Sequence, residues 1–279
     1  MTREMIIMEL KRRGYEAEAK DIIKNGVLLK GITVLTSNNI APIFYTETII
    51  KNAENNGKSL EIVVSEIIDA IEECKVFKFD TNKLMDRNFI LDNIYIGLQK
   101  AGNENFDDIE KKPYEGIKGI EKYLYIRGEE VNGENYSIKV SKSILNRAGI
   151  LSTEAWEYAL NNTKAETVLE SLNKVMCEMA GTEYFEEMDT ELPLFIISNK
   201  SRIKGASAIL NKGMLAQFGE KYHTDKIVVL PSSIHEMLLT PYVEGMDINI
   251  CSDMVREINS TEVDLTEQLV DKAFIITLE

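Results

Sequence analysis

Two short segments in the last third of the chain hold the side chains best suited to chemistry. The first, residues 230–236 (Leu-Pro-Ser-Ser-Ile-His-Glu), places two hydroxyls, an imidazole and a carboxylate within five residues. A hydroxyl beside an imidazole is the arrangement of a nucleophile and its general base. In an extended chain Ser233 and His235 share one face, whereas Ser232 and Glu236 point to the other. Glu236 then cannot orient His235, so a triad requires a carboxylate from elsewhere.

The same segment fits a structural role. Serine side chains often close a turn by hydrogen bonding to nearby backbone. In this interpretation the turn leads into a strand, and His235 is hydrogen-bonded at the end of the sheet. Reactive side chains close in sequence define a site only when their geometry agrees, so the structural role is the simpler interpretation.

The second segment, residues 199–206 (Asn-Lys-Ser-Arg-Ile-Lys-Gly-Ala), follows a predicted strand. It combines three cations with a hydroxyl and an amide. Arginine can bind a carboxylate or phosphate through two parallel hydrogen bonds. Asn199, Ser201 and Arg202 are therefore candidate ligands for an anion, and the alternative is a solvated charged loop.

The distribution of charge sets these segments apart. The chain has 279 residues and a formal net charge of −14, which argues against a general nucleic-acid or anionic-membrane binder. Residues 1–147 carry 22 basic and 24 acidic side chains, whereas residues 148–279 carry 10 and 22. Within the acidic half, residues 199–235 hold six basic and two acidic side chains. This basic island spans both segments, and it either attracts an anion or pairs with its acidic neighbours.

Hairpins and amphipathic helices must position these side chains. Asn-Gly pairs at 25–26 and 132–133 predict two-residue hairpin turns, because asparagine and glycine tolerate positive φ. Residues 59–74 carry one apolar stripe with helical spacing. We expect further helices at 3–13, from Ser152 through Thr163, at 166–180, and near 211–221 and 247–259. We expect strands at 17–23, 27–36, 39–45, 93–99, 120–128, 135–140, 193–198, 226–230, 235–240 and 272–278.

Hairpins mixed with helices, without regular βαβ alternation, predict an α+β fold with mixed, mainly antiparallel sheets and packed helices. We expect two lobes. The N-terminal lobe covers residues 1–147, and the C-terminal lobe covers residues 192–279. Between them, residues 148–191 form a helical connector that ends in an acidic linker at 181–191.

Several classes of function are disfavoured. Two histidines and three widely spaced cysteines, without C-x-x-C or H-E-x-x-H, give no support for a metal. No dinucleotide or phosphate-loop motif points to a cofactor. No apolar run approaches the roughly 18 residues of a membrane span, and no signal peptide is evident. Few cysteines fit a reducing compartment, so we expect a cytoplasmic protein.

The chain resembles an uncharacterised bacterial family known only as a domain of unknown function. The resemblance is carried by residues 198–206, 230–236 and 254–259, and by 39–42 together with the helix at 59–74. It extends over most of the chain but brings no mechanism. It implies only an intracellular bacterial setting, or one in a phage or mobile element.

Our leading hypothesis is a soluble binding module without enzymatic activity, whose partner is a small anion or a protein. Direct binding to nucleic acid or membrane is not expected. One alternative is a hydrolase-like enzyme with His235 as general base. A second alternative is an acidic inhibitor that mimics nucleic acid, which requires one contiguous acidic face. The candidate site comprises Asn199, Ser201, Arg202, Ser232, Ser233, His235 and Glu236.

Overall fold

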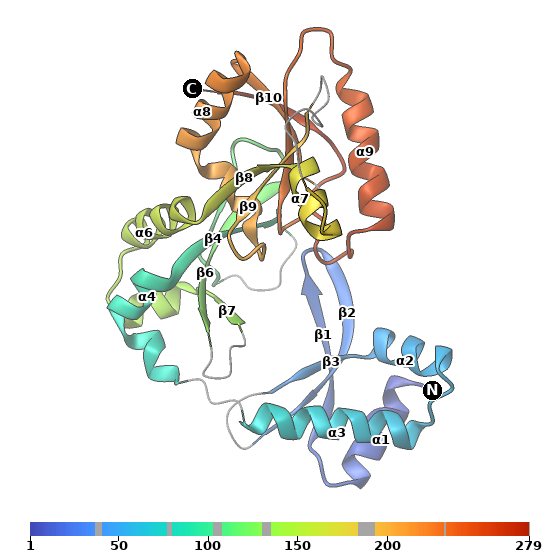
Figure 1. The fold of residues 1–279 in the computed structure, drawn as a ribbon. Helices are drawn as coiled ribbons and strands as arrows, with labels where there is room; N and C mark the ends of the chain where they lie inside the picture. Colours follow the sequence, from blue (N-terminus) through green and yellow to red (C-terminus); the bar gives the residue numbers. More distant parts are fainter. Residues whose placement is uncertain are drawn as a thin grey trace. The chain divides into compact units, whose positions relative to one another are not determined.

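The computed structural model describes residues 1–36, 41–76, 80–102, 108–129, 135–183, 193–231 and 233–278 (Figure 1). Its contacts divide the chain into two compact units. The first unit is Met1–Thr81, and the second joins Asn82–Gly102 to the described residues from 108 onward. This division differs from the boundaries predicted at 147/148 and 191/192. Residues within the expected connector pair with a strand of the expected C-terminal lobe, so the two parts fold together.

The first unit packs helices on a small antiparallel sheet. Asn25 and Gly26 adopt the positive φ values, 50° and 84°, that the predicted hairpin turn requires. The predicted helix at 59–74 is present, and Val63, Val64 and Ile71 of its stripe are almost completely buried. The sheet has the order β1 (Ala17–Lys24), β2 (Val27–Val34), β3 (Ile43–Tyr45). The helices are α1 (Arg3–Arg12), α2 (Thr46–Asn55) and α3 (Leu60–Val76).

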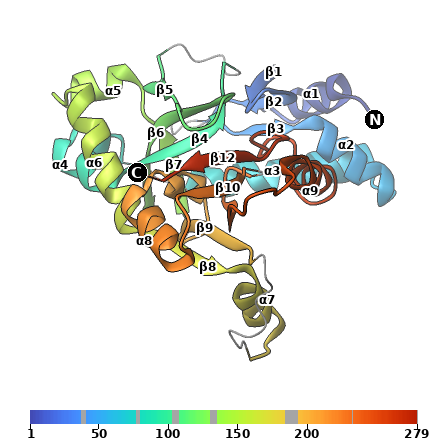
Figure 2. The ribbon, with the colours of Figure 1, turned by 90° about the horizontal axis from the view of Figure 1, so that it is seen from above.

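In the second unit, one antiparallel sheet has two chemically different faces. Its strands are β4 (Ile94–Lys100), β5 (Lys111–Pro113), β6 (Ile120–Glu129) and β7 (Asn135–Lys139), with β6 paired to each of the others. The helices α4 (Arg87–Asn93), α5 (Lys142–Arg147) and α6 (Ser152–Ala165) lie together beside β4 and β6 (Figure 2). Ile94, Ile96 and Leu124 bury one face against these helices, in a core that includes Trp156.

A five-stranded antiparallel sheet completes the second unit. Its order is β12 (Phe274–Thr277), β10 (Lys226–Leu230), β11 (Met237–Pro241), β9 (Phe195–Asn199), β8 (Thr167–Ser171). Leu98 and Ile120 of the four-stranded sheet share a buried core with Ile197 and Met237 of the five-stranded sheet. In Figure 2, α7 projects away from the end of β8. The other helical segments of this unit are η1 (Thr81–Met85), α7 (Leu172–Ala180), η3 (Gly205–Leu210), α8 (Lys212–Tyr222) and α9 (Ile248–Thr261).

The predicted α+β class with mainly antiparallel sheets is confirmed. The prediction of one helix over 166–180 is wrong, because residues 167–171 form β8, and only Leu172–Ala180 is helical. Pairing with the buried strand β9 overrides the helical spacing of this segment. The predicted turn at 132–133 and most of the acidic linker at 181–191 lie outside the described residues. In the described part of the chain, no helix combines the length and apolarity needed to cross a membrane.

Candidate functional site

Aromatic and charged side chains occupy the face of the four-stranded sheet opposite the helices. Tyr95 on β4 lies directly across from Tyr125 on β6, and Arg127 on β6 lies across from Ser137 on β7. Residues two apart on a strand share a face, so Tyr125 and Arg127 belong to one surface. This sheet face therefore gathers phenols and a guanidinium at its end.

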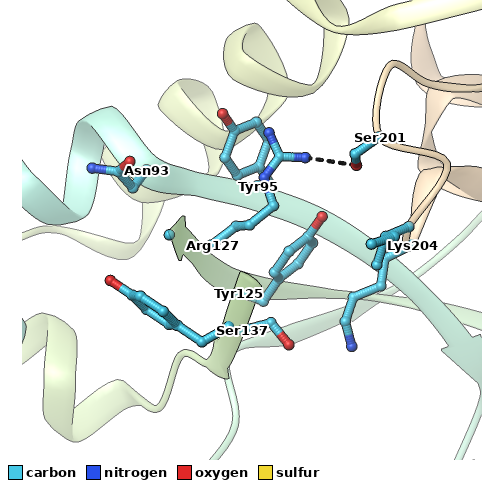
Figure 3. A pocket seen from close by; sticks show the side chains of 10 residues that line it. Asn93, Tyr95, Tyr125, Arg127, Ser137, Ser201 and Lys204 are labelled. Carbon is cyan, nitrogen blue, oxygen red and sulfur yellow. Dashed lines mark hydrogen bonds between the residues drawn. The ribbon is translucent and has the colours of Figure 1, made fainter. Parts of the chain in front are cut away.

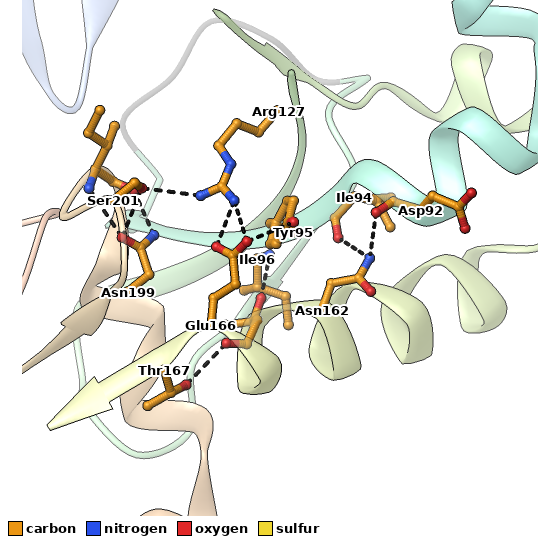
Figure 4. Close-up of polar contacts among 12 residues, drawn as sticks. Asp92, Ile94, Tyr95, Ile96, Arg127, Asn162, Glu166, Thr167, Asn199 and Ser201 are labelled. Carbon is orange, nitrogen blue, oxygen red and sulfur yellow. Dashed lines mark hydrogen bonds and ion pairs between the residues drawn. The ribbon is translucent and has the colours of Figure 1, made fainter. Parts of the chain in front are cut away.

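Arg127 is fixed by three neighbours (Figure 4). Its Nη2 donates to both carboxylate oxygens of Glu166, at 2.5 and 2.6 Å, and its Nη1 donates to Ser201 Oγ at 3.2 Å. The Tyr95 hydroxyl also donates to Glu166, at 3.2 Å. The guanidinium lies over the Tyr95 ring, 4.4 Å from its centroid. The carboxylate and the ring together hold the guanidinium in one plane.

The end of α6 is attached to β4, and this attachment holds Glu166 next to Arg127. Thr163 Oγ1 accepts a hydrogen bond from the Ile96 amide at 3.1 Å, which attaches the last turn of α6 to β4. Asn162 Nδ2 donates to the carbonyl of Ile94 at 2.9 Å, where α4 gives way to β4. Figure 4 shows the contact between Asn162 and Ile94. Glu166 follows the helix directly, so its carboxylate is held opposite the end of β6.

The loop after β9 folds around Asn199. Asn199 Oδ1 accepts from Ser201 Oγ at 3.1 Å and from the Ile203 amide at 3.2 Å, while its Nδ2 donates to the Ile203 carbonyl at 2.8 Å. Arg202 and Lys204 adopt left-handed conformations, with φ of 53° and 55°. Such conformations are costly for residues with a side chain and concentrate at functional sites.

Segment 230–236 meets this loop. His235 Nδ1 accepts from the Lys204 amide at 3.2 Å, and Ser198 Oγ donates to the His235 carbonyl at 2.8 Å. His235 Nε2 lies 3.3 Å from a carboxylate oxygen of Glu267. Because Nδ1 accepts a hydrogen bond from an amide, the hydrogen of a neutral His235 ring is on Nε2, the nitrogen that faces Glu267. Gly205 fits here because a Cβ atom would lie 2.2 Å from Ser198 Oγ.

A cavity of about 450 Å³ opens between the loop and the polar sheet face (Figure 3). Its lining includes Tyr95, Tyr125, Arg127, Ser201 and Lys204. Tyr125 is only 2% exposed, yet no described residue hydrogen-bonds its hydroxyl. In Figure 3 this hydroxyl points toward the space between Arg127 and Lys204. Because Tyr125 lines the cavity, its hydroxyl is available there to a ligand or to water.

The electrostatics of the cavity favour negative charge. Arg127 and Lys204 line it and no described carboxylate does, while Glu166, outside the lining, offsets the charge of Arg127. The Lys204 ammonium lies 5.7 Å from the centroid of the Tyr125 ring. Burial raises the pKa of Tyr125, and burial together with the Glu166 carboxylate raises the pKa of Tyr95. Both phenols therefore remain protonated donors at neutral pH.

A scan against family models matches residues 2–276 to a family of unknown function (DUF5688). The chain belongs to this family. The match confirms the resemblance to an uncharacterised domain and extends over nearly the whole chain. No curated protein and no solved structure matches this DUF5688 chain.

The two predicted segments are adjacent in this DUF5688 member, but only part of the predicted set faces the cavity. Ser201 lines the cavity, and Asn199 shapes the loop that carries Ser201. Arg202 instead donates to Glu170 at 2.7 Å, which is the internal charge pairing considered above. Glu236 lies 4.0 Å from Arg202.

Ser233 and His235 form the turn that the structural interpretation predicts. Ser233 Oγ accepts from the His235 amide at 3.0 Å. Ser232 lies outside the described residues. Among the residues that the structure describes, no group of three or more histidine, cysteine, aspartate or glutamate side chains could hold a metal ion.

The sequence reasoning missed Tyr95, Tyr125, Arg127 and Glu166. One signal was available in the sequence of β6, where Tyr123, Tyr125 and Arg127 alternate with apolar residues. Such alternation predicts a strand with one polar face. No sequence pattern indicated Glu166 as the partner of Arg127, because the end of α6 meets the sheet only in the folded chain.

Proposed function

We propose that this protein binds a small anionic ligand in the cavity between the polar sheet face and the loop after β9. The hydroxyl of Tyr125 is the observation that carries the proposal. It belongs to a side chain that is 2% exposed, it lines the cavity, and it lacks a partner among the described residues. A ligand oxygen that accepts a hydrogen bond from this hydroxyl would gain about 0.5–1.5 kcal/mol.

The aromatic rings favour an anion over a cation. Tyrosine cages bind ammonium ligands through their ring faces. Here the protein's own cations lie over the rings, with Arg127 over Tyr95 and Lys204 over Tyr125. A cationic ligand would meet these charges at close range, whereas an anion is attracted by them.

The two alternative functions receive less support. A general base needs an accessible basic nitrogen. His235 Nδ1 accepts a hydrogen bond from the Lys204 amide, Nε2 lies 3.3 Å from a carboxylate oxygen of Glu267, and His235 is not among the described residues that line the cavity. The acidic-inhibitor hypothesis and the cytoplasmic location stay predictions. We propose a small molecule as the partner because the Tyr125 hydroxyl lies in a cavity and not on an extended face.

Thermal denaturation with a panel of small carboxylates and phosphates tests the proposal. A ligand at 100 times its dissociation constant stabilises the folded state by about 2.7 kcal/mol. We expect a rise in Tm of several degrees for at least one anion with the unmodified chain. Lys204→Glu should abolish the rise. Lys200→Glu makes the same charge change on the same loop at an exposed residue outside the cavity lining, and should preserve it.

Two results would contradict the proposal. One is the absence of any stabilising anion. The other is equal stabilisation of the unmodified chain and of the Lys204→Glu variant, which would place the binding elsewhere. Fluorescence of Trp156, the one tryptophan, confirms that each variant is folded before the comparison.

A further inference from the structure

The cavity presents a flat cationic surface. Arg127 donates in one plane to Glu166 and Ser201, and the Tyr95 ring covers one face of its guanidinium. Arg127 also lines the cavity, so a ligand bound there lies beside its side chain. A guanidinium face held in this way stacks on planar aromatic rings, as arginine does on nucleobases.

Polar groups lie on either side of this surface. Figure 3 shows Asn93 on one side of Arg127, and Tyr125 and Lys204 on the other. Asn93 Nδ2 donates to the Phe89 carbonyl at 2.8 Å, and no described residue donates to Asn93 Oδ1. Asn93 therefore offers an acceptor at one end, while a phenol and an ammonium offer donors at the other.

The size of the cavity limits the ligand. Its volume of about 450 Å³ corresponds to about 15 water molecules at roughly 30 Å³ each. Inorganic phosphate alone would leave most of this space to solvent. The volume lies within the usual range of roughly 300–1,000 Å³ for small-molecule sites.

We propose that the ligand is a nucleoside monophosphate whose base carries an exocyclic amino group. This inference rests on the anion site proposed above. The base stacks on the open face of Arg127 and donates its amino hydrogen to Asn93 Oδ1. The phosphate lies between the Tyr125 hydroxyl and the Lys204 ammonium, where both donate to it. One cavity thus contains the planar guanidinium of Arg127. The acceptor Asn93 Oδ1 lies on one side of it, and the donors of Tyr125 and Lys204 lie on the other (Figure 3).

Isothermal titration calorimetry of the full chain tests this inference with AMP, CMP, GMP, adenosine, ribose 5-phosphate and inorganic phosphate. We expect at least one of the three nucleotides to bind. If AMP binds, adenosine and ribose 5-phosphate should each bind at least tenfold more weakly. If CMP or GMP binds instead, the matching nucleoside replaces adenosine. Arg127→Lys keeps the charge but removes the planar face, so it should weaken the nucleotide at least tenfold and change ribose 5-phosphate less than threefold.

The nucleotide assignment is overturned if none of the three nucleotides binds, or if the nucleoside or ribose 5-phosphate binds as tightly as the nucleotide. It is also overturned if Arg127→Lys weakens nucleotide and ribose 5-phosphate equally. In each of these cases, Lys204-dependent binding of phosphate or of another anion leaves the proposed anion site standing. If none of the anions tested binds, both proposals are contradicted. Asn93→Ser supplies a second variant, expected to weaken the nucleotide without affecting ribose 5-phosphate.

Discussion

The ion pair between Arg127 and Glu166 should be strongly coupled, because it fixes the guanidinium that lines the cavity. Arg127 Nη2 contacts the two carboxylate oxygens at 2.5 and 2.6 Å. The side chains of Arg127 and Glu166 are 19% and 23% exposed. Glu166→Gln keeps the shape of the side chain and removes its charge, and Arg127→Met keeps much of the apolar stem.

The expected magnitude lies between two limits. Breaking a fully buried ion pair costs about 3–5 kcal/mol, and a fully exposed pair contributes about 0.2–1 kcal/mol. With roughly four-fifths of each side chain buried, we expect Glu166→Gln to lower the free energy of unfolding by about 2–3 kcal/mol. The double variant should cost less than the sum of the single variants by about 1.5–2.5 kcal/mol.

Urea denaturation followed by tryptophan fluorescence measures these quantities. Trp156 is 9% exposed and lies on α6, the helix that ends next to Glu166, so its signal reports the unfolding of this unit. The exposed pair of Arg256 and Asp253 provides a control, and Asp253→Asn should change stability by less than about 1 kcal/mol. If the two changes at Arg127 and Glu166 are additive within about 0.5 kcal/mol, the guanidinium is not held by Glu166.

Three further predictions concern burial and the loop. Burial raises the pKa of Tyr114 to about 12. Its folded pKa therefore exceeds the ordinary value of about 10, and the stability it contributes is present below about pH 10 and lost as the pH rises toward 12. Tyr114→Phe should weaken this alkaline loss in urea midpoints measured across that range. Gly205→Ala should cost about 1–3 kcal/mol in the same denaturation assay because its Cβ would overlap backbone, whereas Gly213→Ala on helix α8 has room and should be neutral or stabilising. His235→Ala removes the acceptor of the Lys204 amide, so hydrogen exchange at that amide should accelerate at least tenfold, and unchanged exchange would show that His235 does not hold the loop.

Local patterns in the sequence predicted most of the fold. Asn25-Gly26 specifies its turn through positive φ, and the stripe of helix α3 reflects burial with helical period. The helix predicted at 167–171 was wrong because the helical spacing of this segment competes with strand pairing. Pairing with β9 depends on residues distant in sequence. Tertiary contacts of this kind cannot be predicted from a short stretch of sequence.

The candidate site was only partly predictable for the same reason. Charge clustering correctly drew attention to the loop after β9, and Ser201 lies at the cavity. Arg202 was predicted as an anion ligand because of its guanidinium, but the guanidinium donates to Glu170 on β8 instead. The decisive feature, the unpartnered hydroxyl of Tyr125, depends on what surrounds a side chain, and spacing along the strand carries no such information.

A crystal structure with the best-binding anion of the thermal-denaturation panel tests the central claim most directly. We expect density for the anion between Arg127 and Lys204, with an anion oxygen within hydrogen-bond distance of the Tyr125 hydroxyl. An anion bound elsewhere, with the cavity filled by solvent and Tyr125 bonded to water alone, would contradict the claim that this cavity is the binding site.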